Sequence, residues 1–163
     1  MKSTVSLKDV VDEMDVPGDE HSAFLHRHTG ELGTLSNEEL SAEEEDDEID
    51  DYPEWQRERI IKAKEVIHSD DYLPLPSKFD IDEYHIMEVF CYSVADDKIR
   101  GALLDKIRGS GAFRRFKDAL QVSGIEEDWY SFRQDALEKI AIDWLEINQI
   151  PYAKNEVGEG SIQ

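Results

Sequence analysis

A short glycine loop flanked by cations is the part of this sequence best suited to bind a ligand. The loop Gly109-Ser110-Gly111 leads into a predicted helix, so backbone N–H groups at the helix start lack partners within the helix. Such N–H groups, together with nearby guanidinium groups, bind phosphate and other anions. The predicted anion site consists of Arg108, Gly109, Ser110, Gly111, Arg114, Arg115 and Lys117. An ordinary break between two helices, with solvated or acid-paired arginines, also explains the same residues.

Charge is unevenly distributed along the chain. The 163 residues carry a formal net charge of -21, and residues 1–54 account for -15 of it. Between Lys98 and Lys117, in contrast, seven cations stand against one carboxylate, Asp105. A strongly negative body repels nucleic acid and anionic membranes, so any contact with phosphate must be made locally by this basic stretch.

The negatively charged N-terminal third contains one strongly acidic segment. Ten of the fifteen residues from Asn37 to Asp51 are acidic. The segment has too few apolar side chains to offset the entropy cost of ordering its backbone. Residues 37–53 are therefore predicted to be a disordered linker, with a transient helix over 37–48 as the alternative. The proposed acidic interaction segment, which would engage a basic protein partner, consists of Glu43, Glu44, Glu45, Asp46, Asp47, Glu48, Asp50 and Asp51.

Other groups with chemical potential form weaker patterns. His26 and His28 share one face of a predicted strand, with His21 upstream, but zinc needs three or four protein ligands, so we predict neither a metal nor a cofactor. An enzyme built around His85, Glu88 and Cys91 is the least favoured alternative, and a satisfied core hydrogen bond explains the first two. The sequence contains no nucleophile elbow, Walker loop or dinucleotide fingerprint. No catalytic residue is therefore assigned.

Apolar periodicity predicts a mainly helical α+β fold. Ser6 precedes a helix with apolar residues at 7, 10, 11 and 14, and a β-hairpin turns at Thr29-Gly30-Glu31. Four to five helices are expected around a central, buried helix from Ile81 to Val94, and Asp80 is its expected cap. The expected boundaries are residues 1–36 for the helix and hairpin, 37–53 for the linker, 54–150 for the helical core and 151–163 for a flexible tail.

Spacing also predicts which large side chains form the core. Helical periodicity across three segments places five residues together: Phe90, Phe116, Trp129, Leu137 and Trp144. The single cysteine, Cys91, lies inside an apolar run, which suits a reducing compartment. No run of eighteen apolar residues occurs, so we expect a soluble, cytoplasmic protein with no membrane partner.

Several short motifs resemble a known family. They are Gly111-Ala112-Phe113-Arg114-Arg115-Phe116-Lys117-Asp118, Trp129-Tyr130, Trp144-Leu145, Thr29-Gly30-Glu31 and Met87-Glu88 before Phe90. In these motifs the chain resembles the bacterial uncharacterised protein family numbered 158. The resemblance implies a small, mainly helical, bacterial cytoplasmic protein and transfers no catalytic residue.

Two functional hypotheses follow from the charged surfaces. In the first, a non-enzymatic regulatory or interaction protein engages a basic partner, with its acidic third acting as a polyanion mimic. In the second, a module that binds an anionic ligand or nucleic acid uses the Arg108–Lys117 stretch.

Overall fold

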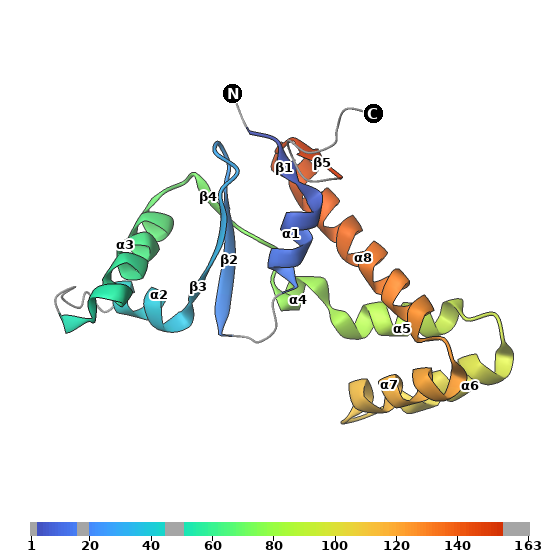
Figure 1. Ribbon diagram of the computed structural model, residues 1–163. Coiled ribbons are helices and arrows are strands. Elements are labelled where there is room, and N and C mark those ends of the chain that lie inside the picture. Colours follow the sequence, from blue (N-terminus) through green and yellow to red (C-terminus); the bar gives the residue numbers. More distant parts are fainter. Residues whose placement is uncertain (1–2, 16–19, 45–50, 155–163) are drawn as a thin grey trace. The chain divides into compact units, whose positions relative to one another are not determined.

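The computed structural model describes residues 3–15, 20–44 and 51–154, and these form a mainly helical α+β fold (Figure 1). In chain order its elements are β1 (Val5–Ser6), α1 (Leu7–Met14), β2 (His21–His26), β3 (Leu32–Ser36), α2 (Asn37–Glu44), α3 (Glu54–His68), β4 (Tyr72–Pro74), α4 (Lys78–Ile81), α5 (Glu83–Ser93), α6 (Asp97–Lys106), α7 (Ala112–Ser123), α8 (Glu126–Ile147) and β5 (Tyr152–Ala153). None of the described helices is both long and apolar enough to cross a membrane.

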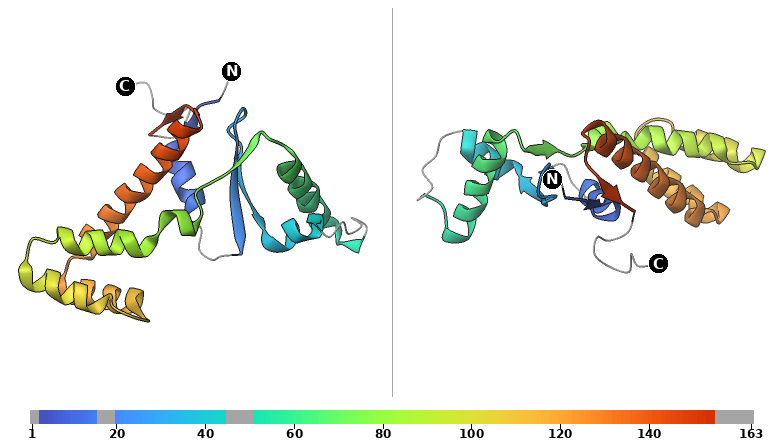
Figure 2. Two further views of the ribbon diagram at one scale, coloured as in Figure 1. Left: turned by 180° about the vertical axis from the view of Figure 1, so that it is seen from behind. Right: turned by 90° about the horizontal axis from the view of Figure 1, so that it is seen from above.

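The predicted hairpin is present and belongs to a three-stranded sheet of order β3-β2-β4. Strands β2 and β3 pair antiparallel, with Leu25 opposite Leu32, and β4 pairs antiparallel with the other edge of β2 (Figure 2). Strand β4 extends the hairpin by a third strand, which together with packed helices stabilises a ribbon that is marginal by itself in water.

The sheet packs against α2 and α3. Its buried cluster contains Phe24, Leu35, Ala63 and Tyr72, with Leu40 and Val66 partly buried against it. Gly33 is required here, because a Cβ atom at that position would lie 2.7 Å from Cζ of the Phe24 ring. The two helices therefore cover an apolar face that the hairpin cannot bury alone.

Helix α2 occupies the beginning of the segment predicted to be a disordered linker, so that prediction is wrong for residues 37–44. A reciprocal capping box starts the helix: Ser36 Oγ accepts from the Glu39 N–H at 3.1 Å, and Glu39 Oε2 accepts from the Ser36 N–H at 3.2 Å. Glu39 is buried and also pairs with Arg59 of α3, whose guanidinium donates to the Thr34 carbonyl. Residues 45–50 lie outside the described residues, so disorder there stays a prediction.

Helix α1 begins as predicted. Ser6 accepts a hydrogen bond from the Asp9 N–H, and the four apolar residues Leu7, Val10, Val11 and Met14 are buried. Strand β1 pairs in parallel with β5, with Val5 opposite Tyr152. The prediction of a flexible tail from residue 151 is therefore wrong for Tyr152 and Ala153, which are strand residues. Residues 155–163 lie outside the described residues, so the prediction is not tested there.

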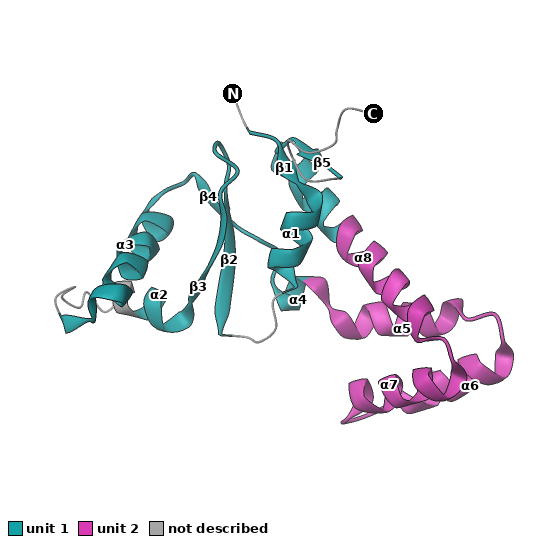
Figure 3. Ribbon diagram, in the orientation of Figure 1, with its two compact units in different colours: residues 1–80, 140–163 teal, residues 81–139 magenta. Residues whose placement is uncertain are grey.

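The chain divides into two compact units (Figure 3). Unit 1 comprises residues 1–80 and 140–163, and unit 2 comprises residues 81–139. This division differs from the expected single helical core over 54–150, because α3 packs on the sheet of unit 1. The expected boundary at residue 54 followed the charge pattern, which does not show where a helix buries its apolar face.

Aromatic rings form the core of unit 2. Phe90 of α5 contacts the rings of Phe116, Trp129 and Phe132 edge-on, with centroids 5.4 to 6.1 Å apart. Four of the five predicted core residues are buried, but Trp144 is only half-buried and belongs to unit 1. Its helical spacing was correct, but helix α8 continues from one unit into the other.

Helix α5 differs from the predicted central helix in two respects. It is buried on one side only, because Tyr84, Val89 and Tyr92 are exposed. Asp82 caps the helix by accepting a hydrogen bond from the His85 N–H. The expected cap, Asp80, instead accepts hydrogen bonds from Ser77 at the start of α4. Within unit 2 the Glu83 carboxylate pairs with the guanidinium of Arg133, at 2.8 to 3.0 Å, and joins α5 to α8.

Candidate functional site

Arg115 stabilises the glycine loop that was predicted to bind anions. Gly109 and Gly111 adopt positive φ values of 74° and 77°, which favour glycine. The Arg115 guanidinium donates to the carbonyl of Lys106 at 2.9 Å, to that of Ser110 at 2.5 Å and to that of Arg108. Three of its donors are thus used within the protein, where they hold the loop in place.

The other predicted anion-site residues remain accessible. Arg108, Gly109, Ser110, Gly111, Arg114 and Lys117 are all exposed. Ser110 does not cap α7, because Gly111 occupies the N-cap and provides no side-chain acceptor. The first N–H groups of α7 therefore have no side-chain cap next to Arg114.

The acidic interaction segment falls mostly outside the described residues. Glu43 and Glu44 end α2, and their side chains are not described, while residues 45–50 lie in the gap. Asp51 is exposed just before α3. The role of Glu43, Glu44, Glu45, Asp46, Asp47, Glu48, Asp50 and Asp51 stays a prediction.

The three N-terminal histidines are not arranged as a metal site. His26 Nδ1 accepts from the backbone N–H groups of His28 and Thr29, which occupies one of its two possible ligand atoms. His28 Nε2 lies 3.2 Å from a carboxylate oxygen of Asp71. In the described part of the chain, no three His, Cys, Asp or Glu side chains gather as a metal site would require.

His85, Glu88 and Cys91 do not form a buried catalytic group. His85 is exposed and Glu88 is half-buried, so the expectation that they are buried together is wrong. Cys91 is completely buried, and burial raises the pKa of its thiol to about 11. A nucleophilic cysteine needs a lowered pKa, so this environment opposes thiolate chemistry.

The most connected polar cluster lies where α3 meets the sheet. The Lys62 ammonium donates to the Tyr72 hydroxyl at 2.8 Å and to Glu31 at 3.0 Å, and Tyr72 donates to Glu65 at 2.9 Å. Burial by itself lowers the pKa of the Lys62 ammonium group, but the hydrogen bonds to Tyr72 and Glu31 outweigh this effect, so the pKa of Lys62 is raised. Lys62 therefore stays protonated, and the cluster is suited to attaching α3 to the sheet instead of transferring protons.

An apolar groove of about 550 Å³ lies within unit 1, between the segment after β4 and the end of α8. Ile147 is 79% exposed there. The groove is lined by Pro74, Leu75, Pro76, Ser77, Asp80, Ile140, Asp143, Trp144 and Ile147. Two of these residues are acidic and none is basic. One of these residues, Trp144, was assigned to the core by its spacing in the sequence.

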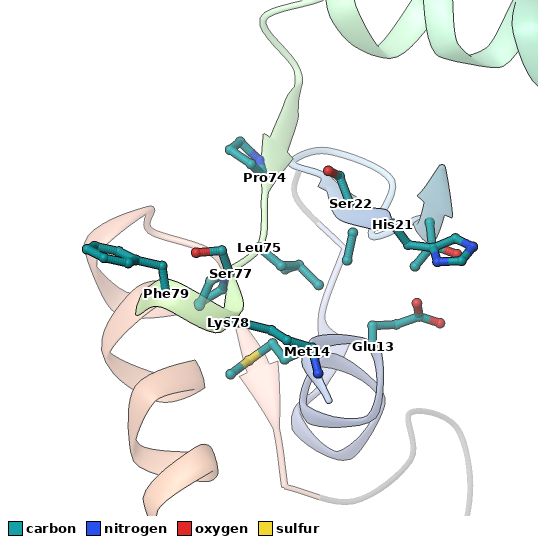
Figure 4. Close-up of a pocket in the computed structure, with 12 residues that line it drawn as sticks. Glu13, Met14, His21, Ser22, Pro74, Leu75, Ser77, Lys78 and Phe79 are labelled. Carbon is teal, nitrogen blue, oxygen red and sulfur yellow. The ribbon is translucent and has the colours of Figure 1, made fainter. Parts of the chain in front are cut away.

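A second cavity, of about 360 Å³, lies where α1 and the sheet meet α4 (Figure 4). It has an apolar base, which includes the buried residues Met14 and Leu75, and a polar rim. Three titratable side chains line it: Glu13, His21 and Lys78. Sequence reasoning missed this site, because its residues come from four separate segments and share no local motif.

Comparison with known proteins identifies the family. The model of an uncharacterised protein family, UPF0158, matches residues 3–161. The chain belongs to this family. A UPF0158 protein from Pseudomonas aeruginosa is 25% identical over 154 residues, which cover 94% of this chain and 88% of the relative. No solved structure matches the chain.

The motif on which the UPF0158 resemblance rests has a structural explanation in this chain. Gly111 provides the positive φ at the start of α7, and the Arg115 guanidinium donates hydrogen bonds to carbonyl groups of the preceding loop. Ala112 and Phe116 are buried in unit 2. Burial and loop geometry thus account for much of the motif, while Arg114 and Lys117 are exposed.

Proposed function

We propose that this UPF0158 protein is a non-enzymatic interaction protein that binds a partner through a segment combining apolar and basic residues. One observation carries the proposal: the groove beside α8 is open and mainly apolar, and its charged lining residues are two acids with no base. Exposed apolar patches with polar rims mark interaction surfaces on soluble proteins.

Charge selects the partner. The acids among the groove residues, Asp80 and Asp143, favour Lys or Arg beside the apolar anchor of the occupant, and the net charge of -21 adds long-range attraction. An acidic occupant would be repelled both by the groove acids and by the net charge. The predicted acidic segment around residues 43–51 favours the same kind of partner and would add a second contact, as a polyanion mimic.

A peptide pair tests the proposal. The first peptide alternates leucine with lysine, and the second has glutamate in place of each lysine. Fluorescence anisotropy at low salt should show binding of the lysine peptide only, weakening as salt screens the charges. Substituting Ile147→Ser should reduce its affinity by about tenfold, because a buried isoleucine contributes about 1.5 kcal/mol or more.

Val122→Ser is the matched control, since Val122 is an 89% exposed apolar residue on α7, outside the groove. It should leave the affinity unchanged. Equal affinity for the two peptides, equal effects of the two substitutions, or no binding would contradict the proposal.

A second candidate function is the binding of an anionic ligand or nucleic acid at the start of α7. The observation that favours it is the absence of a side-chain cap on α7 beside exposed Arg114 and Lys117. Tripolyphosphate should then bind the intact protein, and Lys117→Gln should weaken binding severalfold while Lys98→Gln, at another exposed lysine, does not. Binding that is insensitive to both changes would exclude this site.

A further inference from the structure

The cavity near α1 combines an apolar base with opposite charges. Its volume of about 360 Å³ is near the small end of ligand pockets, which range over about 300–1,000 Å³. Met14 and Leu75, at 4% and 6% exposure, form part of the base. In Figure 4 the Lys78 side chain extends from α4 towards α1, and Glu13 and His21 appear on the other side of the opening.

The three titratable groups around the cavity are available to a ligand. Within the described residues, no side-chain hydrogen bond or ion pair involves Glu13, His21 or Lys78. Elsewhere in unit 1, Arg59 and Lys62 pair with carboxylates. The cavity thus offers an ammonium donor, a carboxylate acceptor and an imidazole, all without a partner in the described chain.

The charges decide which ligand class fits. A simple anion would meet Lys78 but would be repelled by Glu13 and by the net charge of -21. A simple cation would meet Glu13 but would be repelled by Lys78. A neutral apolar molecule would displace water from both charges without replacing their hydrogen bonds, which costs free energy.

A zwitterion satisfies both charges at once. We propose that this cavity binds a small zwitterion with an apolar side chain, of the class of a free hydrophobic amino acid. Lys78 binds its carboxylate, Glu13 binds its ammonium group with His21 as a further hydrogen-bond partner, and the side chain contacts Met14 and Leu75. The groove of the proposed function shares the Pro74–Ser77 wall but none of these charged residues, so the two proposals can fail separately.

Isothermal titration calorimetry with the full-length protein tests the assignment. The probes are L-leucine, leucinamide, which lacks the carboxylate, and 4-methylpentanoate, which lacks the amine. Leucine should bind, and each analogue should bind at least about tenfold more weakly, because each leaves one charged protein group unpaired.

Two variants connect each preference to one residue. Lys78→Met should abolish the preference for leucine over leucinamide, and Glu13→Gln should abolish its preference over 4-methylpentanoate. Lys98→Met and Glu58→Gln, at exposed positions outside the cavity, are the matched controls and should retain both preferences. Circular dichroism verifies that each variant folds.

The proposal is overturned if leucine does not bind the unmodified protein at millimolar concentration. It is also overturned if both analogues bind as tightly as leucine, or if the preferences survive in the folded Lys78→Met and Glu13→Gln variants.

Discussion

Replacing Glu39 by alanine tests whether α2 is a folded part of unit 1. Glu39 Oε2 accepts from the Ser36 N–H, and its Oε1 pairs with Arg59 Nε at 2.5 Å. Its side chain is only 7% exposed, although α2 lies in the most acidic part of the sequence. The substitution removes both interactions and leaves the backbone of α2 intact.

The expected cost is about 1–2 kcal/mol. Loss of the hydrogen bond between the Ser36 N–H and the Glu39 carboxylate costs about 1 kcal/mol. The ion pair adds at most about 1 kcal/mol, because the Arg59 side chain is 46% exposed and regains water in the variant. With a urea m-value of about 2 kcal/mol/M, the midpoint should fall by about 0.5–1 M.

Urea unfolding followed by circular dichroism measures this shift, with Glu38→Ala as the control. Glu38 is a neighbouring, exposed acid whose side chain accepts a 3.3 Å hydrogen bond from Gln56, so its loss should cost less than about 0.5 kcal/mol. Amide hydrogen exchange of α2 should also accelerate in Glu39→Ala. Identical midpoints for the two variants would refute the docking of α2.

Three further predictions concern the core and two titratable groups. Phe116→Ala should destabilise unit 2 by about 3–5 kcal/mol, whereas Phe113→Ala, at a 41% exposed residue, should cost far less in the same urea assay. Cys91, with a pKa of about 11, is about one part in a thousand thiolate at pH 8, so a thiol reagent should react only on unfolding, and rapid labelling of folded protein would contradict its burial. The raised pKa of Lys62 gives stability that is fully present below its unfolded pKa of about 10.5 and is lost as pH rises through the folded value. The stability difference between the natural protein and Lys62→Met should therefore shrink above about pH 10.5, and a difference independent of pH would rule out this linkage.

Short-range signals in the sequence were sufficient for several elements. The Ser6 cap and apolar spacing located α1, and Thr29-Gly30-Glu31 located the hairpin turn. These signals act between residues one helical turn or one tight turn apart, so a single sequence contains them completely.

Tertiary structure decided how those elements are used. The charge of residues 37–44 suggested disorder, but burial of Glu39 against Arg59, twenty residues away in sequence, stabilises α2. Arg115 was predicted to meet a ligand, but the loop geometry turns its guanidinium towards three carbonyls. The α1 cavity draws its charged residues, Glu13, His21 and Lys78, from segments separated by up to 65 positions. Periodicity and composition describe each segment by itself, whereas ion pairs, loop carbonyls and cavities depend on which segments pack together.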